Sequence, residues 1–321
     1  MIRALVETAS NPIPSGTRVD SLPLAGGKEL RYAITSAGNQ PVQGTVIVLH
    51  GRNECIEKYF ETVRDIADRG FTVATFDWRG QGASSRLLRN RAKGYVKSFD
   101  NYASDLELLF ESVLLPDCRG PYYILAHSAG ALTALLAAPA LSNRIRRMVL
   151  LAPLLDINGS RTRKMMASLA ARTLRSTGLG GAYMLGGPHK MKSFAVNEVT
   201  SDEARYLRNC EILERAPDLA IGGPTASWIA AAAKAIKQIN RPEFIETIRI
   251  PMLVIAAGAD SVVSTPAVER FALQVRNTTL LTIDGAKHEI LQEKDFYREQ
   301  FFAAFDAFIP GTGDESLRLT G

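Results

Sequence analysis

Cysteine is scarce in this 321-residue sequence, and the three that occur, Cys55, Cys118 and Cys210, are scattered. They form no CxxC pair and no Cys/His cluster, so the sequence predicts neither a disulfide framework nor a structural zinc site. The first residues lack the long apolar stretch and the small-residue cleavage site of a signal peptide. We therefore expect a protein of a reducing compartment, the cytoplasm.

Extremes of composition are also missing. With 46% hydrophobic and 22% charged residues, the chain is neither a disordered tail nor a collagen-like fibre, and it is too long for a disulfide-stapled miniprotein. No internal repeat is visible. The length fits one large α/β domain, or a core domain that carries an inserted module.

One apolar run has the length of a membrane span. Residues 122–141 are almost wholly apolar, although His127-Ser128-Ala129-Gly130 interrupts them with polar and flexible residues. A buried strand, a tight turn and a buried helix produce the same hydropathy as a membrane helix. We therefore predict a strand, a turn and a helix here.

Short apolar runs alternate with helical patterns along most of the chain, which is typical of βαβ units and a parallel sheet. The predicted fold class is therefore α/β, with a mostly parallel sheet and helices on both of its faces. The expected strands are Thr45–His50, Phe71–Asp77, Tyr122–Ala126, Met148–Ala152, Met252–Ala257 and Thr279–Ile283. The expected helices cover about residues 56–67 and 102–114, a helix that begins at Pro266 with Thr265 as its N-cap, and a last helix from about Lys294 to Ile309.

Residues 157–241 interrupt this alternation. They contain no clear strand, several Gly and Ala clusters, and helical stretches such as Ala226–Ile239. We expect them to form an inserted helical cap over the carboxyl edge of the sheet, and we call them the cap segment. The α/β core is then predicted to comprise residues 1–156 and 242–321.

Part of the cap segment, residues 161–192, is strongly basic. Met165, Met166 and Leu169 lie among the basic side chains, and no acidic residue occurs there. A solvated helix face is one interpretation. A basic amphipathic surface that contacts anionic lipid headgroups, with the protein peripheral at the inner membrane surface, is the alternative. Nucleic acid is not expected as a partner, since no stacking platform or recognition motif accompanies the charge. The basic residues are Arg161, Arg163, Lys164, Arg172, Arg175, Lys190 and Lys192.

The clearest chemical signal is the segment Ala126-His127-Ser128-Ala129-Gly130, where a strand ends and a helix begins. A serine on such a sharp turn presents its hydroxyl above the sheet, and its neighbours at two residues' distance must be small. The usual pattern is G-x-S-x-G, and this sequence has Ala126 where the first glycine normally stands. Ser128 is therefore the candidate nucleophile.

A serine hydroxyl needs a base to remove its proton and an acid to orient that base. Among the four histidines, His288 follows a predicted strand, so its loop lies over the carboxyl edge. His127 adjoins the serine but points elsewhere on a sharp turn, and we expect a structural role for it. Asp260 follows another strand at the same edge. The order Ser128, Asp260, His288 is that of α/β hydrolases, whose sites lie at this edge of the sheet.

A tetrahedral intermediate also needs hydrogen-bond donors for its oxyanion. The Ala129 N–H, at the start of the helix after Ser128, is one candidate. The second is the Arg52 N–H, because Gly51 allows the backbone after an early strand to turn toward the site. The sequence does not show whether the Arg52 guanidinium takes part, and a solvent-facing arginine is the alternative.

These segments resemble the monoacylglycerol lipase-like branch of the α/β-hydrolase superfamily, and its bacterial lysophospholipases in particular. The resemblance extends over most of residues 30–309. It implies a serine hydrolase with a helical cap, with the residue roles given above and without a cofactor or metal ion. The segments that carry it are His50-Gly51-x-x-Glu54, residues 76–84 (FDWRGQGAS), the serine turn, residues 222–228 (GGPTASW), and the Asp260 and His288 loops.

The expected function is therefore hydrolysis of carboxylic esters of single-chain acyl lipids, of the lysophospholipase or monoacylglycerol lipase type. The substrate would be a small acyl lipid or ester. A carboxylesterase for short esters, an aminopeptidase of the same fold and a non-catalytic ligand-binding module are the alternatives. Dehalogenase or epoxide hydrolase chemistry is disfavoured, because those relatives have an aspartate where Ser128 stands.

Overall fold

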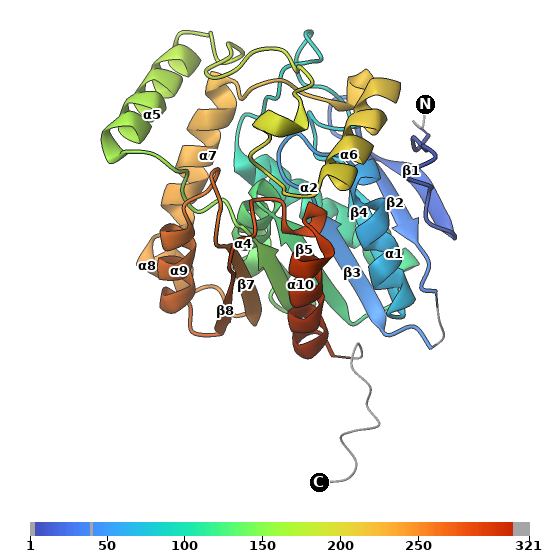
Figure 1. Cartoon of the computed structure of the whole chain (residues 1–321). Coiled ribbons are helices and arrows are strands. Elements are labelled where there is room, and N and C mark those ends of the chain that lie inside the picture. Colours follow the sequence, from blue (N-terminus) through green and yellow to red (C-terminus); the bar gives the residue numbers. More distant parts are fainter. Residues whose placement is uncertain (1–3, 39–40, 311–321) are drawn as a thin grey trace.

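An eight-stranded sheet runs through the centre of the molecule (Figure 1). The computed structural model describes residues 4–38 and 41–310. The strand order is β1-β2-β4-β3-β5-β6-β7-β8; β1, β2 and β4 pair antiparallel, and the pairs from β4 to β8 are parallel. The strands are β1 (Thr17–Leu24), β2 (Lys28–Thr35), β3 (Gly44–Leu49), β4 (Phe71–Phe76), β5 (Tyr122–His127), β6 (Ile145–Leu151), β7 (Met252–Ala257) and β8 (Thr278–Ile283).

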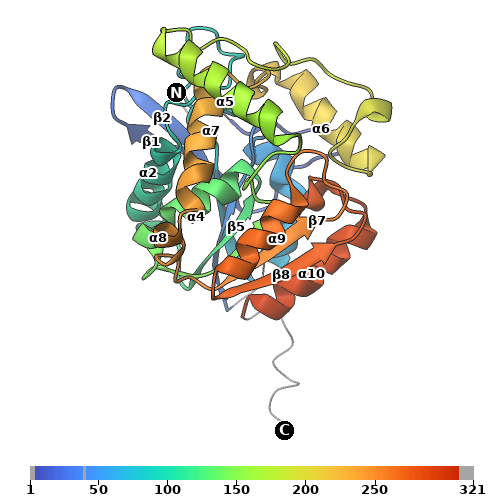
Figure 2. The same ribbon diagram turned by 90° about the vertical axis from the view of Figure 1, so that its left-hand side faces the viewer.

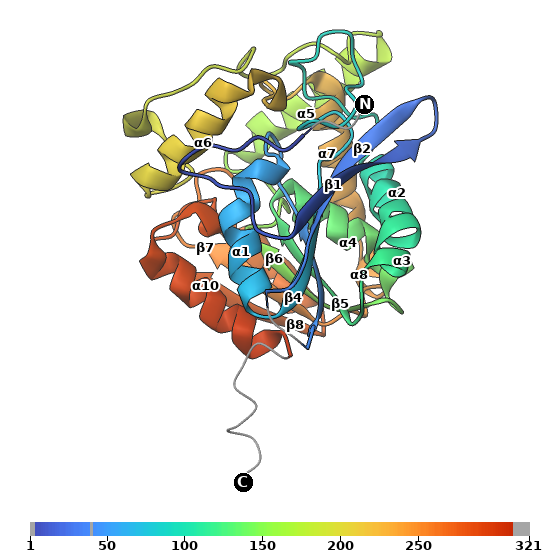
Figure 3. The ribbon, with the colours of Figure 1, turned by 90° about the vertical axis from the view of Figure 1, so that its right-hand side faces the viewer.

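Helices cover both faces of the sheet, as the sequence predicts. One face packs against α2, α4, α7 and α9, and the other packs against α1 and α10 (Figures 1 and 3). The main helices are α1 (Phe60–Asp68), α2 (Phe99–Leu109), α4 (Ala129–Leu141), α5 (Arg161–Ser176), α6 (Glu203–Arg215), α7 (Ala226–Ile239), α9 (Thr265–Gln274) and α10 (Asp295–Phe308), and the short ones are α3 (Leu115–Asp117) and α8 (Pro242–Ile245).

All six predicted strands are confirmed to within three residues at each end. The sequence reading missed β1 and β2, which form an antiparallel hairpin at one edge of the sheet. Alternate residues of β1 are exposed, so this strand lacks the continuous apolar run that marks the central strands. The Gly26-Gly27 pair, both residues with positive φ, joins the two strands and was the available signal.

The apolar run at residues 122–141 forms β5 and α4, as predicted. Within the described part of the chain, no helix is long and apolar enough to cross a membrane.

The predicted start of the helix after β7 was wrong by one residue. Ser264, not Thr265, precedes the first residue of α9, and the Thr265 hydroxyl instead donates to the Ala257 carbonyl at 2.8 Å. The hydroxyl therefore joins the helix to the end of β7.

The helices of the cap segment differ in how they contact the sheet. The side chains of Trp228, Ala231 and Ala235 on α7 belong to the main hydrophobic core, whereas α5 contributes buried Ala171 and partly buried Leu174 to a small apolar cluster beneath it. Helices α5 and α6 lie beyond one end of the strands (Figures 1 and 2). The helix Ala226–Ile239 has the predicted limits.

Hydrogen bonds join the cap segment to loops at the carboxyl edge after three different strands. Asn158 donates to the Asp260 carbonyl at 2.9 Å, after β7. The Glu289 N–H donates to the Val199 carbonyl at 2.8 Å, after β8. The Ile221 N–H donates to the Asn53 side chain at 2.8 Å, after β3. The cap segment thus contacts the ends of three separate strands. Its treatment as a separate unit over residues 157–241 remains a prediction.

Candidate active site

Ser128 lies on a strained turn between β5 and α4. Its φ of 52° and ψ of −114° belong to a region that side-chain-bearing residues rarely adopt. Backbone hydrogen bonds fix the turn: the Ser128 N–H donates to the Leu151 carbonyl at 3.0 Å, and its carbonyl accepts from Leu132 and Leu154, each at 3.1 Å. The hydroxyl is thereby held at the end of the sheet in a defined direction.

The two small neighbours of Ser128 face different constraints. A Cβ on Gly130 would lie 2.5 Å from the Leu49 carbonyl oxygen and 2.6 Å from that of His50, both of which belong to the backbone. Only glycine fits there. Ala126 is fully buried within β5, where its methyl group packs into the core. The departure from G-x-S-x-G is therefore compatible with the sharp turn.

The three predicted triad side chains lie within hydrogen-bonding distance of one another. His288 Nε2 is 3.0 Å from Ser128 Oγ, and His288 Nδ1 is 2.7 Å from Asp260 Oδ2. The Asp260 carboxylate can only accept, so His288 carries its proton on Nδ1 and its Nε2 accepts from the serine hydroxyl. The loops after β5, β7 and β8 supply these three side chains.

The carboxylate of Asp260 is fixed by its own loop. Its Oδ1 accepts from the N–H groups of Val262 at 2.7 Å and Val263 at 2.9 Å, which leaves Oδ2 for His288. The carboxylate side chain is completely buried. Both of its oxygens therefore have defined donors, and the imidazole is held in one orientation.

The two candidate oxyanion donors lie on neighbouring strands. Leu49 at the end of β3 pairs with Ala126 of β5, so the Arg52 and Ala129 segments follow adjacent strand ends. Ala129 is the first residue of α4, and its N–H has no acceptor within the helix. In the described part of the chain, the Arg52 N–H donates no hydrogen bond. Both groups are available to an incoming oxygen atom.

A buried polar cluster lies behind the triad and was not predicted. His127 Nδ1 is 3.3 Å from Glu54, and His127 Nε2 is 3.1 Å from the carbonyl oxygen of His288. Glu54 also accepts from the Gly51 N–H, from the Tyr59 hydroxyl at 2.7 Å and from Lys58 at 3.0 Å. The residue before the candidate nucleophile thus holds the backbone of the candidate base, in agreement with the structural role expected for His127.

Charge explains why this cluster is stable when buried. Burial alone would raise the pKa of the Glu54 carboxyl, but the charges of Lys58 and His127 hold that pKa well below its usual range. Burial alone would lower the pKa of His127, and Glu54 raises it instead. Lys58 contacts Glu289 at 2.6 Å as well. Part of this polar cluster could have been predicted from the sequence, because Glu54 and Lys58 are four residues apart at the start of a helical pattern.

The other two histidines lie apart from the triad. His50 is completely buried at the end of β3, where its carbonyl accepts from the Trp78 indole at 2.8 Å. His189 lies in the cap segment. Among the described residues, no group of three or more His, Cys, Asp or Glu side chains is arranged to hold a metal ion, and all three cysteines are free thiols.

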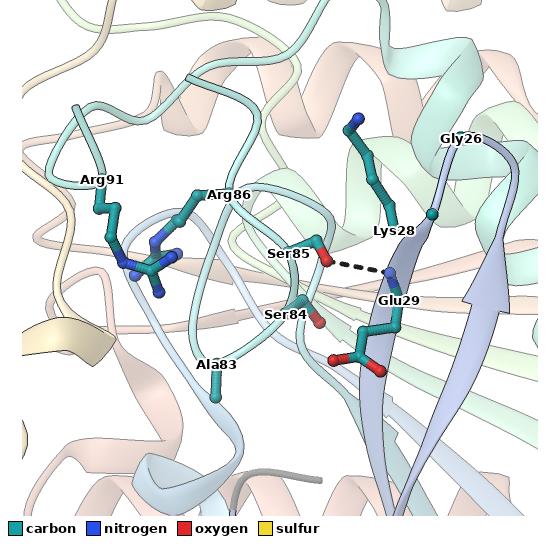
Figure 4. A pocket seen from close by; sticks show the side chains of 9 residues that line it. Gly26, Lys28, Glu29, Ala83, Ser84, Ser85, Arg86 and Arg91 are labelled. Carbon is teal, nitrogen blue, oxygen red and sulfur yellow. Dashed lines mark hydrogen bonds between the residues drawn. The ribbon is translucent and has the colours of Figure 1, made fainter. Parts of the chain in front are cut away.

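A polar hollow of about 330 Å³ lies elsewhere on the molecule (Figure 4). It opens between the β1–β2 turn at Gly26 and the loop of residues 83–91, and Ser85 accepts from the Glu29 N–H there at 3.0 Å. Lys28, Glu29, Arg86 and Arg91 bring charges of both signs to its lining. None of the triad residues contributes to this hollow, so it is not the candidate active site.

Comparison with known families gives one match over most of the chain. The family model described as "Serine aminopeptidase, S33" matches residues 40–295. A "Probable lysophospholipase L2" of Haemophilus influenzae is 29% identical over 282 residues, which cover 88% of each chain. "Lysophospholipase L2" of Escherichia coli K12 is 31% identical over 266 residues, which cover 79% of this chain and 76% of the relative.

Solved structures share the fold at lower identity. A monoglyceride lipase of Saccharomyces cerevisiae superposes with a TM-score of 0.73 at 18% identity, over 92% of this chain and 97% of the other. A monoacylglycerol lipase of Paleococcus ferrophilus gives 0.70 at 20% identity, over 88% and 99%. The expected α/β-hydrolase fold is thereby confirmed, and the chain belongs to the serine aminopeptidase S33 family of α/β hydrolases.

Proposed function

We propose that this protein is a serine hydrolase that cleaves carboxylic esters of single-chain acyl lipids, with Ser128, His288 and Asp260 as its triad. The observation that carries the proposal is the unbroken hydrogen-bond chain from Ser128 Oγ to His288 at 3.0 Å and from His288 to Asp260 at 2.7 Å. The strained turn at Ser128 and the two free N–H groups beside it supply the remaining parts of an acyl-transfer site.

The proposed reaction has two halves. Ser128 Oγ attacks the ester carbonyl while its proton passes to His288 Nε2, and the buried Asp260 carboxylate stabilises the imidazolium that forms. His288 then donates that proton to the leaving alkoxide, the ester C–O bond breaks, and an acyl-serine remains. Water, deprotonated by His288, attacks the acyl group and releases the fatty acid with a regenerated serine.

The backbone donors act on the charge that develops between these steps. We infer that the Arg52 and Ala129 N–H groups bind the oxyanion of each tetrahedral intermediate. Removal of one such donor from a known hydrolase costs about 100- to 1000-fold in turnover. The strain at Ser128 supports this assignment, because it aims the hydroxyl and the following N–H into the same space.

The names of the relatives support a lipid substrate. Two relatives at about 30% identity are described as lysophospholipases, and two structural relatives as lipases for monoacylglycerols. We propose that the cap segment, residues 157–241, covers the site and receives the acyl chain. Its hydrogen bonds to the loops after β3, β7 and β8 support this role.

The decisive experiment is replacement of the nucleophile. Ser128→Ala should lower kcat/KM for 1-oleoylglycerol, lysophosphatidylcholine and p-nitrophenyl butyrate by several orders of magnitude, since the hydroxyl forms the covalent intermediate. It should also abolish covalent labelling by a fluorophosphonate. Ser142→Ala, at the far end of α4, is the matched control and should retain full activity.

Three outcomes would contradict the proposal. Unchanged turnover in Ser128→Ala would remove the triad. Failure of the wild-type protein to react with the fluorophosphonate would indicate a ligand-binding module. Preference for aminoacyl amides over acyl esters, measured as kcat/KM on the same panel, would favour an aminopeptidase.

We also propose that α5 contacts an anionic membrane surface. Met165, Met166 and Leu169 are each 64% exposed on this helix, and basic side chains surround them. The opposite side of α5 packs through Ala171 against α7. Lys164 pairs with Asp156, but among the described residues no carboxylate lies within 4 Å of the other basic side chains of α5. Exposed apolar groups among cations are typical of helices that lie in a headgroup layer.

A further inference from the structure

The side chain of Arg52 occupies an unusual position between the candidate oxyanion loop and the cap segment. Its Nη2 donates to the carbonyl oxygen of Gly222, and its guanidinium lies 5.3 Å from the centre of the Trp228 ring. A Cβ on Gly94 would lie 2.9 Å from the same Nη2. The guanidinium is therefore closely packed and held in one place, and it is not the solvent-facing arginine that was the alternative.

This guanidinium has no compensating charge. In the described part of the chain, no carboxylate lies within 4 Å of Arg52, and its Nε is shielded from solvent without a hydrogen-bond partner. Two other buried arginines provide the contrast: Arg31 contacts Glu57 and Asp77, and Arg298 contacts Asp65. A buried cation without a partner is costly, so its retention calls for a ligand.

The neighbouring hydroxyls do not supply the missing anion. Tyr102 and Tyr183 are the ionisable groups that act on Arg52. Burial raises the pKa of Tyr102 to about 12 and also raises that of Tyr183, so both are neutral near pH 7. Burial lowers the pKa of Arg52 to about 10, which still leaves it charged at that pH. The guanidinium is thus a positive charge that is largely shielded from water.

The position of this charge relative to the reaction is fixed by the chain itself. The Arg52 backbone N–H is the proposed oxyanion donor, so the guanidinium lies within one arginine side-chain length of the group that would contact the reacting carbonyl. In a lysophospholipid, the three-carbon glycerol unit separates the ester from the phosphate. A phosphate at Arg52 and an ester carbonyl at Ser128 are therefore compatible with one short polar substrate.

We propose that the Arg52 guanidinium is a binding subsite for the phosphate of a lysophospholipid headgroup. The inference rests on the proposed ester hydrolase function and adds the headgroup chemistry. Arginine suits this role because its planar fork donates two parallel hydrogen bonds to a phosphate. The unpartnered Nε is one donor available for such a bond, and the bound anion supplies the charge that the protein lacks.

The test compares two esters with the same acyl chain, of which only one carries a phosphoglycerol group. Octanoyl-lysophosphatidylglycerol carries a phosphodiester, whereas monooctanoylglycerol is neutral with the same chain. The measured quantity is the ratio of their kcat/KM values, in which any effect on the oxyanion hole cancels. Arg52→Met should lower this ratio by about 10- to 100-fold, the worth of a hydrogen bond to a charged group. Arg52→Lys, which keeps the charge, should lower it less.

Arg86→Met is the matched control. Arg86 also joins the core to the cap segment, since its Nη2 donates to the Asp218 carbonyl oxygen. If Arg52 only holds the cap segment in place, the two Met variants will change the ratio of the two kcat/KM values equally. The proposal expects the ratio to change in Arg52→Met and to stay constant in Arg86→Met. Melting temperatures of both variants show whether each is folded.

A second measurement identifies the source of the phosphate. Glycerol 3-phosphate should inhibit p-nitrophenyl butyrate hydrolysis by the wild type competitively and more strongly than inorganic phosphate, and this inhibition should weaken in Arg52→Lys. Equal inhibition by inorganic phosphate would overturn the headgroup assignment. An unaltered substrate ratio in an active Arg52→Met variant would overturn the subsite alone. A wild-type protein that cleaves neither lipid would instead refute the proposed function.

Discussion

Gly130 shows how a single residue limits the geometry of the candidate nucleophile. The helix after Ser128 starts so close to β3 that any side chain at residue 130 would collide with the Leu49 and His50 carbonyl oxygens. These atoms belong to the backbone of a central strand and its loop, so they cannot move aside without disturbing the sheet. The close approach also brings the Ala129 N–H toward the loop of Arg52.

We predict that Gly130→Ala destabilises the protein by about 2–4 kcal/mol, the range of severe overpacking, and lowers esterase activity further than stability alone explains. Urea unfolding and kcat/KM on the same preparations measure the two effects. Gly187→Ala is the control, because a Cβ there meets nothing within 4 Å. Equal free energies of unfolding for the two variants would contradict this prediction, because they would show that the end of β3 can shift to accommodate the methyl group at little cost.

The candidate triad residues could be chosen from their order and their position after apolar runs, but the sequence could not predict the polar cluster of Glu54, Lys58 and His127 behind them. Ser128, Asp260 and His288 each follow a strand, and strands are visible as apolar runs. Glu54 and His127 are 73 residues apart, and Glu54 and Lys58 carry no local signal beyond their helical spacing. A contact between distant polar residues depends on strand order, which a single sequence does not reveal.

At the scale of elements, α6 is joined to the core by a charged cluster. Arg205 contacts Glu61 of α1 at 2.7 Å and Asp295 of α10 at 2.6 Å, and Arg208 contacts Glu61 at 2.6 Å. Burial would raise the pKa of Glu61, but these arginines lower it to about 2. One carboxylate therefore links a helix of the cap segment to α1.

We predict that Glu61→Gln lowers the free energy of unfolding by about 1–3 kcal/mol at pH 7. The folded-state pKa is depressed, so this contribution is complete above about pH 4.5 and is lost as the pH falls toward 2. The difference between wild type and variant should accordingly shrink below pH 4.5. Denaturant unfolding across pH 3–8 measures it, with exposed Glu214→Gln on α6 as the control.

A difference that stayed constant from pH 7 to pH 3 would contradict the electrostatic explanation. It would show that the variant loses packing and hydrogen bonds, not the paired charge.

The edge hairpin of β1 and β2 shows which strands could not be predicted from the sequence. Central strands were predicted because both faces are buried and their residues are continuously apolar. In β1 only Leu22 is buried, and four polar or charged residues interrupt the apolar pattern. An edge strand also pairs on one side only, so its sequence is under weaker constraint. The pattern in β1 is accordingly close to that of a loop.

At the scale of the whole molecule, the charge is positive and unevenly distributed. The formal net charge is +5 at pH 7, and residues 161–192 contribute seven basic side chains. Helix α5 carries most of them and lies at the periphery of the molecule (Figure 2). A surface of this kind attracts anionic lipid from a distance that is limited by the salt concentration.

We predict that the protein floats with liposomes that contain phosphatidylglycerol, but not with those of phosphatidylcholine alone, and that 0.5 M salt releases it. The variant Met165→Ser/Leu169→Ser should bind at least severalfold more weakly, since two exposed apolar side chains are lost. Leu273→Ser, which removes an 83% exposed leucine from α9, is the control. Equal binding to both lipids would exclude the electrostatic contact.

The hydrogen bonds between the cap segment and the strand ends have one further consequence. Asn158, Val199 and Ile221 are hydrogen-bonded to the loops that carry the three candidate groups, namely the Asp260 carboxylate, the His288 imidazole and the Arg52 N–H respectively. The proposal that the cap segment covers the site therefore implies that a substrate which displaces this segment also strains the loops beneath it. Under that proposal, a displaced cap segment and an ordered Ser128–His288–Asp260 chain would be alternative states, and return of the cap segment would restore the chain around the bound substrate.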